Sequence, residues 1–375
     1  MTIVLLLALA AAPQERETKV RDAIVALEKG LTTKDESVGD QIDLLRLVKE
    51  MERRGSIPDG TSDGFRNRGI RRLEENLSTI VSAPGALNGG WDRIEPLSVR
   101  LNGAGDEAQA LCRVTIGGKK GKFRFWLTRA GDSWKTFDYE NLDGTYRLSV
   151  IGLQYAPGVS DDEDRNALRD AVMTLQRGAV YLSKGEARGA RDALEMARQS
   201  EPPAYVKDWI ELVDGLALNA LGNPSGGLKA AERVLVRQQD LAVAHRLKAT
   251  CHASLGEHAK AILAAKEYLR IVGDDPEAWV LVGEASEKLG QADEALEAYR
   301  KAAEADPQDR TSRCRLVAAL AIAGKRETAV QELRTLLDRH PEWHASAVTG
   351  QGLEEFRKLP AVQELLDNAR GRAQK

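Results

Sequence analysis

The chain has 375 residues, of which 42% are apolar and 30% are charged, values that are typical of a globular protein and exclude a disordered chain. Lys and Arg total 54 and Asp and Glu total 57, so the net charge of −3 does not indicate a nucleic acid or an anionic membrane as partner. The three cysteines are widely spaced and form no disulfide framework and no C-x-x-C pair, so we expect no metal and no cofactor.

The N-terminus begins with the apolar run Ile3–Ala12, which has the length of a signal-peptide core and is too short to span a bilayer. Ala8 and Ala10 form an A-x-A cleavage site, although no Lys or Arg precedes the run. We therefore expect a signal peptide over residues 1–12 and a protein exported to the periplasm or the extracellular space. A cytoplasmic protein with an apolar N-terminus is the alternative.

Residues 13–150 form a predicted α+β domain. Helical spacing of apolar residues comes first, over 20–27, 42–51 and 70–81. Alternation with a period of two comes next, over 98–101, 108–116, 122–128, 133–139 and 146–150, with glycine-bearing turns that favour an antiparallel meander. Eight of the 18 aromatic residues (five Phe, six Trp, seven Tyr) lie between Trp91 and Tyr146, which indicates a domain distinct from the C-terminal half of the chain.

The strand-rich stretch "FRFWLTRAGDSWKTFDYENLDGTYRLS" resembles the C-terminal hairpins of cone-shaped, nuclear transport factor-like or cystatin-like domains, and also those of bacterial periplasmic lipid-shuttling proteins. The resemblance includes no diagnostic motif. It implies two functions besides simple packing: a carrier that holds an apolar small molecule or lipid, or an enzyme that uses Asp138 or Asp143 as general base. Both carboxylates flank a predicted turn, where solvated structural roles are far more common.

A polar segment, residues 151–166, is the predicted linker to the second half, and there the chain repeats itself. Gly222, Gly256, Gly290 and Gly324 are spaced by 34 residues, and small residues recur seven positions before and five after most of them. Each copy predicts two helices joined by a turn: the glycine ends the first helix, small residues let the helices approach closely, and a proline stops the second helix. Such hairpins bury their apolar faces only by stacking.

These copies resemble the tetratricopeptide repeat family. The best copy carries Trp279, Val282, Gly283, Ala295, Tyr299 and Pro307 against the family pattern W-x2-L-G…A-x3-F…P. The resemblance implies an all-α solenoid over residues 167–342, with units at 171–202, 208–241, 242–275, 276–309 and 310–342, and a helical cap over 343–375. The structural positions that define the repeats are Gly178, Gly185, Gly215, Gly222, Ala249, Gly256, Ala261, Trp279, Gly283, Gly290, Ala295, Tyr299, Pro307, Gly324, Ala329 and Pro341.

The family binds peptides or partner helices on the concave face formed by the first helix of each unit. By register, the lining implied here is Leu175, Ala179, Leu182, Trp209, Leu212, Leu216, Asn219, Arg246, Thr250, Val280, Glu284, Glu287, Cys314, Ala318 and Ala321. Its N-terminal end is apolar and its fourth unit is acidic. We expect a non-catalytic, exported scaffold or adaptor with a protein or peptide partner. The apolar end has a second interpretation, in which the N-terminal domain packs into it.

Two further motifs have plain structural interpretations. "HPEWH" places His340 and His344 four residues apart, but Pro341 breaks the helix between them, so zinc is not expected. "GGKKGKFRFW" sets three lysines beside Phe123, Phe125 and Trp126, which we interpret as a charged hairpin tip and a core strand rather than a nucleic-acid site.

Overall fold

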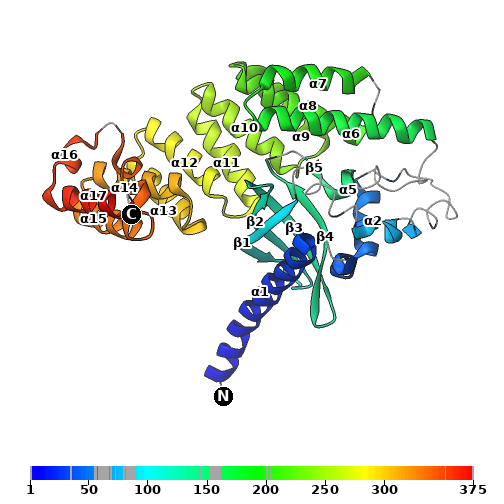
Figure 1. The fold of residues 1–375 in the computed structure, drawn as a ribbon, viewed down its shortest axis with the longest axis horizontal. Coiled ribbons are helices and arrows are strands. Elements are labelled where there is room, and N and C mark those ends of the chain that lie inside the picture. Colours follow the sequence, from blue (N-terminus) through cyan, green and yellow to red (C-terminus); the bar gives the residue numbers. More distant parts are fainter. Residues whose placement is uncertain are drawn as a thin grey trace. The chain divides into compact units, whose positions relative to one another are not determined.

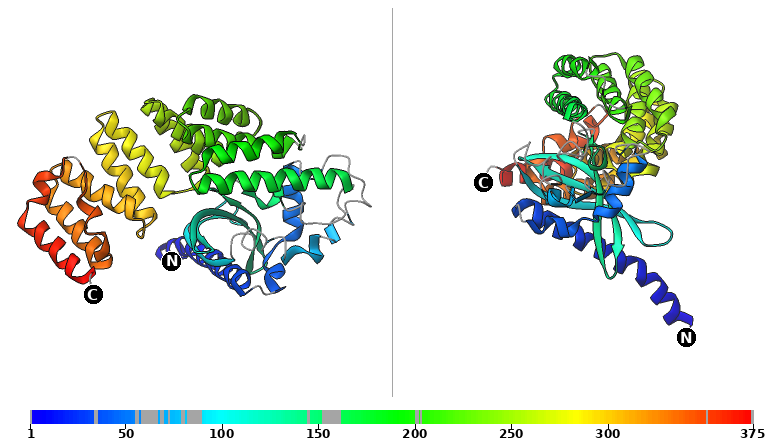
Figure 2. Two further views of the ribbon diagram at one scale, coloured as in Figure 1. Left: turned by 45° about the horizontal axis from the view of Figure 1, so that its top comes forward. Right: turned by 90° about the vertical axis from the view of Figure 1, so that its right-hand side faces the viewer.

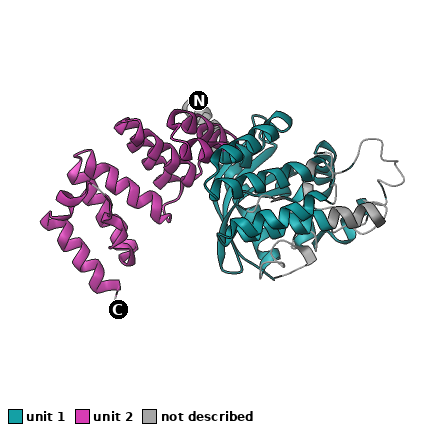
Figure 3. Ribbon diagram, turned by 90° about the horizontal axis from the view of Figure 1, so that it is seen from above, with its two compact units in different colours: residues 1–247 teal, residues 248–375 magenta. Residues whose placement is uncertain are grey.

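The computed structural model describes residues 2–33, 36–54, 57, 67, 70–71, 73–78, 81, 90–143, 146–151, 162–199, 202, 204–350 and 352–373. Most of the predicted linker 151–166 lies outside these residues. The chain separates into two compact units, residues 1–247 and residues 248–375 (Figure 3). The α+β part comes first in the chain and the helical repeats come after it (Figure 1).

The first unit contains the predicted antiparallel meander. Its strands β1 (Trp91–Leu101), β2 (Glu107–Ile116), β3 (Lys119–Ala130), β4 (Ser133–Asn141) and β5 (Tyr146–Arg147) pair in chain order. The prediction of a longer fifth strand is wrong, because α5 (Leu148–Ile151) begins directly after Arg147. The reason is local: Ser149 donates its backbone N–H and its hydroxyl to the Asp138 carboxylate rather than continuing the ladder.

Among the described residues, helix α1 and the segment that ends at Val81 cover the apolar face of this sheet, since the Tyr139 hydroxyl donates to the Val81 carbonyl. Helix α1 (Thr2–Thr33) packs along β1 and β4 (Figure 2), and its buried residues are Val20, Ile24, Leu27 and Leu31, as the helical spacing predicts. Arg21 of α1 donates to the Pro96 carbonyl over 3.0 Å. On the sheet side the rings of Trp91, Phe123, Phe125 and Tyr139 contact one another with centroids 5.5–6.2 Å apart. This face is therefore a filled aromatic core.

The second predicted helix needs a correction. Helix α2 (Leu44–Arg53) begins after Asp43, whose side chain caps it, and buries Leu47, Val48 and Met51. Leu45 is 69% exposed, and Ile42 lies before the helix in a bridge to Thr136 of β4. The cap sets the start of the helix, and packing against β4 and α5 decides which residues face inward. Of the third predicted face, Leu73, Leu77 and Val81 are buried, and Ile80 lies outside the described residues.

Each predicted repeat unit contains one helical hairpin. The hairpins are α6 (Asp162–Ser183) with α7 (Ala187–Gln199), α8 (Ala204–Ala220) with α9 (Pro224–Arg237), α10 (Ala242–Ser254) with α11 (His258–Val272), α12 (Pro276–Lys288) with α13 (Ala292–Ala305), and α14 (Arg310–Ile322) with α15 (Arg326–Arg339). The boundary between the two compact units falls within α10.

The turn inside every hairpin is built in the same way. Gly185, Gly222, Gly256, Gly290 and Gly324 have φ between 73° and 79°, in the left-handed region that favours glycine. The residue after each glycine donates its N–H to a carbonyl five positions back, as Glu257 does to His252 and Gln291 to Ser286. This is the Schellman arrangement, and it satisfies carbonyls that the end of the first helix leaves open.

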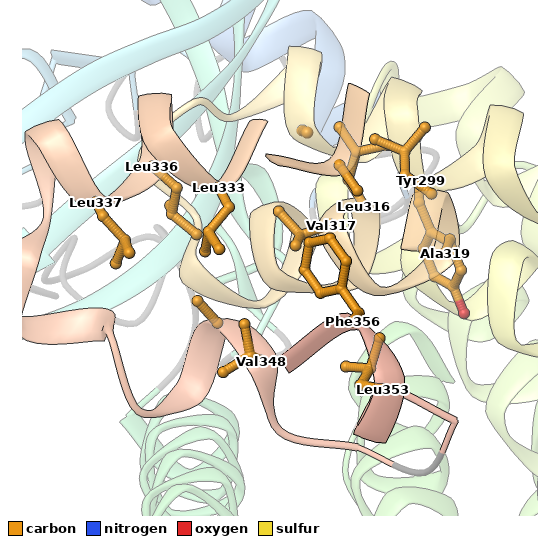
Figure 4. Packing of buried hydrophobic residues seen from close by; sticks show 14 of the residues in the cluster. Tyr299, Leu316, Val317, Ala319, Leu333, Leu336, Leu337, Val348, Leu353 and Phe356 are labelled. Carbon is orange, nitrogen blue, oxygen red and sulfur yellow. The ribbon is translucent and has the colours of Figure 1, made fainter. Parts of the chain in front are cut away.

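The predicted C-terminal cap closes the last hairpin. It consists of η3 (Pro341–Trp343), η4 (Ser346–Val348), α16 (Glu354–Arg357) and α17 (Pro360–Ala373). Figure 4 shows Leu353 and Phe356 of the cap beside Leu316 and Val317 of α14. Val362 and Leu365 are buried in the same cluster, so the end of the helical stack is covered, as a solenoid requires.

Candidate functional site

The helices of the repeats cross closely because glycine replaces a side chain at the crossing. A Cβ added to Gly283 would lie 2.5 Å from Cε1 of Tyr299, and one added to Gly215 would lie 2.9 Å from the Ala230 methyl group. A Cβ on Gly178 would approach Leu194 to 3.0 Å. These contacts are between the first and second helices of single hairpins. The small residues found in the sequence therefore set the helix spacing, which in turn places the face of the first helices.

The predicted lining of that face divides by burial. Leu175, Trp209, Leu212 and Val280 are buried, so in this structure they belong to the core between helices rather than to a surface that a partner could reach. The half-buried positions are Ala179, Leu182, Leu216, Asn219, Arg246, Thr250, Glu284, Cys314, Ala318 and Ala321. Glu287 is exposed. The apolar character of the N-terminal end of the lining thus reflects packing, since its largest side chains point inward.

Arg246 of α10 holds the turn that comes after β4. Its Nη1 donates to Oδ1 of Asp143 over 2.9 Å and its Nη2 donates to the carbonyl of Leu142 over 2.5 Å. Arg246 occupies the same repeat position as Leu212, Val280 and Cys314, each 34 residues from the next. The N-terminal domain therefore contacts a predicted lining residue of the third hairpin. A second contact joins Arg54, at the end of α2, to Asp240 over 3.5 Å.

The cap covers the corresponding face of the fifth hairpin. Cys314, Ala318 and Ala321 of α14 pack against the hydrophobic cluster that contains Val348 and Leu353 of the cap. Burial raises the pKa of the Cys314 thiol, which therefore stays protonated at neutral pH. These three residues form a contact inside the chain, so the fifth hairpin offers little of its predicted lining to a partner.

The fourth hairpin keeps an open and acidic face. Glu284 of α12 is 44% exposed and forms an ion pair with Arg315 of α14, and Glu287 lies one turn further along α12. At the start of α12, the Nε1 of Trp279 donates to Asp274 over 3.1 Å and the Lys301 ammonium lies 4.6 Å from the centre of the Trp279 ring. Glu284 and Glu287 thus give α12 an accessible acidic face, whereas Trp279 contacts Lys301 of α13 and packs against the core.

The two carboxylates considered for acid–base chemistry, Asp138 and Asp143, both accept hydrogen bonds from neighbouring groups. Asp138 is fully buried: its Oδ2 accepts from Arg147 Nε over 2.5 Å and from the Ser149 hydroxyl over 2.8 Å, and its Oδ1 accepts from the N–H groups of Tyr139 and Ser149. Asp143 accepts from Arg246 and, over 2.8 Å, from the N–H of Lys122. Each oxygen of both carboxylates thus accepts at least one hydrogen bond from the chain itself. Both carboxylates hold structure together.

Asp138 is part of a buried charge network that the sequence pattern did not predict. Glu50 of α2 accepts from Arg147 over 2.9 Å, from Arg53 over 2.6 Å and from Arg54 over 3.0 Å. Burial alone would raise the pKa of Glu50, but the hydrogen bond from Arg53 and the charges of the neighbouring arginines outweigh it and lower that pKa to about 2. The signal in the sequence was the alternation of charged residues in the strands, since Asp138 and Glu140 occupy alternate positions of β4.

Two family models match the repeat region. Residues 227–302 match the family described as anaphase-promoting complex, cyclosome, subunit 3, and residues 289–374 match the family described as tetratricopeptide repeat. The helical part of the chain is a tetratricopeptide repeat array. Stacked hairpins of this type present extended surfaces to protein ligands, so the coarse function of the chain is that of a protein-interaction scaffold.

Solved structures of tetratricopeptide repeat type are similar at low identity. MamA 41-end from Desulfovibrio magneticus RS-1 is 18% identical over 45% of this chain and 94% of its own, with a TM-score of 0.39. A tetratricopeptide repeat protein from Parabacteroides merdae is 14% identical over 55% and 79%, with a TM-score of 0.42. The protein TTC0263 of Thermus thermophilus is 16% identical over 49% and 98%, with a TM-score of 0.38. No curated protein matches the chain.

The lysine-rich hairpin outside the tetratricopeptide repeats has a structural role. Lys119 and Lys120 are exposed at its tip, whereas Phe123 and Phe125 belong to the aromatic core. Trp126, on the opposite face, lies under two guanidinium groups, with the carbon of Arg147 3.8 Å and that of Arg124 4.3 Å from its centre. These rings are already covered, so they present no stacking platform for bases.

The side chains of the "HPEWH" motif, residues 340–344, contact one another and nearby groups of the chain. The His340 ring stacks on Trp343 with centroids 3.8 Å apart, and its Nε2 lies 3.1 Å from Gln308. His344 Nδ1 lies 3.0 Å from the Pro341 carbonyl. Within the described residues no group of three or more His, Cys, Asp or Glu could hold a metal ion. The described helices include none that is long and apolar enough to cross a membrane.

Proposed function

We propose that the chain is an exported, non-catalytic adaptor that binds a protein partner on the first helices of its tetratricopeptide repeats. The observation that carries this proposal is the accessible face of α12 in a stack of hairpins built on one turn geometry. In solenoids of this kind, the first helices of successive repeats line one continuous surface. The third and fifth hairpins use their share of that surface for contacts within the chain, which leaves the fourth as the place for a partner.

The chemistry of that face favours a partner with a basic segment. Glu284 and Glu287 are one helical turn apart, and Arg315 already neutralises part of the charge of Glu284. A lysine or arginine of the partner can pair with Glu287 or replace Arg315 at Glu284. Such pairs steer association and set its orientation more than they add affinity, so binding should weaken as the salt concentration rises.

The non-catalytic part of the proposal is supported by the state of the two candidate carboxylates. Asp138 and Asp143 accept hydrogen bonds from arginine and backbone N–H groups on both oxygens. Among the described residues, the aromatic rings of the sheet are buried and pack against one another. These contacts support a structural role for the N-terminal domain.

The adaptor function is tested by capture from the envelope fraction with three baits. The baits are the wild-type chain, the double variant Glu284→Lys with Glu287→Lys, and the charge-matched control Glu294→Lys with Glu297→Lys on the exposed side of α13. We expect a protein that binds to the wild type and to the control but not to the double variant. The proposal is wrong if all three baits retain the same proteins.

Export is tested separately. The apolar run over residues 3–12 and the Ala8–Ala10 pattern are the features that motivate it. We expect the native protein to begin near Ala11 and to fractionate with the envelope. N-terminal sequencing that finds Met1 or Thr2 on a cytosolic protein would contradict export and leave the adaptor function standing.

A further inference from the structure

A small pocket lies within the second compact unit (Figure 3), between the second helices of its last two hairpins. Its walls belong to α13 and α15 and its floor to α14, and the buried residues Ala303, Leu316 and Leu320 form its apolar lining. None of its residues belongs to the lining predicted for the first helices. Its volume of about 170 Å³ lies below the roughly 300–1,000 Å³ of pockets that hold small organic ligands. The pocket therefore suits a single aliphatic side chain.

The charged groups around this pocket are paired within the chain, with one exception. Nη1 of Arg313 lies 3.5 Å from Oε2 of Glu332, and Nη1 of Arg300 lies 2.8 Å from Oε2 of Glu297. Glu304 of α13 also lines the pocket and is exposed, and among the described residues it has no ion-pair partner. An unpaired carboxylate beside an apolar floor favours an aliphatic group that is accompanied by a cation.

Helix α11 of the same compact unit carries the complementary groups. Leu263 is 69% exposed, more than any other large apolar side chain described in residues 248–375. Lys266 lies one helical turn further along the same face, is exposed, and has no ion-pair partner in the described part of the chain. An aliphatic side chain with a cation one turn away matches the apolar floor with Glu304 beside it. Burial of Leu263 would also remove apolar surface from water.

We propose that the pocket receives Leu263 of a second copy of this chain, and that Lys266 of that copy pairs with Glu304. Helices α11, α13 and α15 are all second helices, and the second helices of successive hairpins form one face of a solenoid. The donor helix and the pocket of one copy therefore both face the other copy. The result is a two-fold dimer that contains each contact twice and leaves the acidic face of α12 outside the interface.

The dimer is weak and depends on protein concentration. Each copy contributes one aliphatic side chain and one exposed ion pair, and exposed pairs add little free energy and are screened by salt. We therefore expect a dissociation constant of roughly 1–100 μM, with a modest increase at high salt because the apolar contact is not screened.

Sedimentation velocity of the full chain, from about 1 μM to about 0.5 mM, tests this proposal. We expect the wild type to pass from monomer to dimer over that range. Leu263→Ser should raise the dissociation constant at least about tenfold, because each dimer buries this side chain twice. Val236→Ser is the matched control: Val236 is 80% exposed on α9, outside residues 248–375, and its loss should leave the dissociation constant unchanged.

A charge exchange tests whether the pocket at Glu304 is where Leu263 binds. Lys266→Glu and Glu304→Lys should each raise the dissociation constant about fivefold at low salt, and the two together should restore it because the ion pair is reversed. A chain that stays monomeric up to the highest concentration would overturn the proposal. So would a dimer that Leu263→Ser leaves unchanged, or a double variant as weak as the single ones. These measurements involve neither Glu284 nor Glu287, so they are separable from the capture experiment.

Discussion

Gly283 and Tyr299 show how single residues set the geometry of the repeats. The space in which a Cβ of Gly283 would stand is taken by the Tyr299 ring, so the two helices of the fourth hairpin pack backbone against ring. The hydroxyl oxygen of Tyr299 is buried, lies near the Glu287 carboxylate and makes no hydrogen bond of normal length among the described residues. Burial, aided by the nearby Glu287 carboxylate, raises the pKa of this hydroxyl, so it stays protonated.

Gly283→Ala should destabilise the second compact unit, residues 248–375, because the new methyl group would overlap the Tyr299 ring and force α12 and α13 apart. We expect a loss of about 1–3 kcal/mol in the free energy of unfolding, measured by urea denaturation. Gly371→Ala on α17 is the matched control, since a Cβ there meets nothing within 4 Å. That control should be neutral or gain roughly 0.5–1 kcal/mol from helix propensity. Equal effects of the two substitutions would contradict the crossing geometry.

Tyr299→Phe should change stability little, because it removes a buried hydroxyl that has only the Glu287 carboxylate near it and makes no hydrogen bond of normal length. Tyr268→Phe should instead cost about 1–2 kcal/mol, since the Tyr268 hydroxyl donates to Asp275 over 2.7 Å and Asp275 also caps α12. Thermal melts of both variants decide. A large loss for Tyr299→Phe would show that its hydroxyl has a partner after all.

At the scale of elements, buried charges join α2, β4 and α5. Glu50 binds Arg147, Arg147 binds Asp138, and Asp138 binds both polar groups of Ser149 at the start of α5. All four residues are buried. Buried charges destabilise the folded state unless each one is paired. Removing one partner leaves the other charge buried and unpaired. The network therefore fixes how α2 and α5 dock on the sheet.

Glu50→Gln should destabilise the first compact unit, residues 1–247, by an amount that depends on pH. The pKa of Glu50 is lowered from 4.5 to about 2, so its carboxylate contributes stability above pH 4.5 that is lost as the pH falls through 2. The difference between wild type and variant should be largest near pH 7, up to about 3 kcal/mol, and should shrink between pH 4.5 and 2. Urea unfolding at several pH values measures it. A difference that does not change with pH would contradict the ionised network.

At the scale of the whole molecule, the predicted two-domain organisation differs from the way the chain compacts. The first compact unit includes the sheet and the hairpins up to Leu247, and Arg246 and Arg54 provide ion pairs across it. The predicted linker 151–166 lies inside this unit along the sequence. The N-terminal domain and the first hairpins therefore belong to one compact unit and contact each other.

A protease site inserted between Ala156 and Asp161 should yield fragments that stay together. We expect co-elution in gel filtration at low salt, because both ion pairs and their surroundings remain. At about 1 M salt we expect two peaks, since partly exposed pairs are screened. Asp143→Asn should separate the fragments at lower salt than the wild type. Two peaks already at low salt would mean that the N-terminal domain and the repeats are independent.

The sequence alone determined the parts of this protein that depend on neighbours along the chain. The spacing of 34 residues located the turn glycines because a left-handed backbone is a local requirement that glycine meets best. The period of two located the meander, since side chains alternate across a strand whatever lies above it. The helical face of α1 was predictable from spacing for the same reason.

Only the tertiary structure decided what depends on residues far apart. Leu45 is exposed and Leu47 buried because α2 packs on β4 and α5 with the side of Leu47 facing them. Asp138 anchors the start of α5 because Arg147 and Ser149 reach it from beyond the turn. Arg246 is occupied because a turn 103 residues earlier folds back onto it. Such contacts join groups that no local pattern connects, so burial and partner choice were settled by packing.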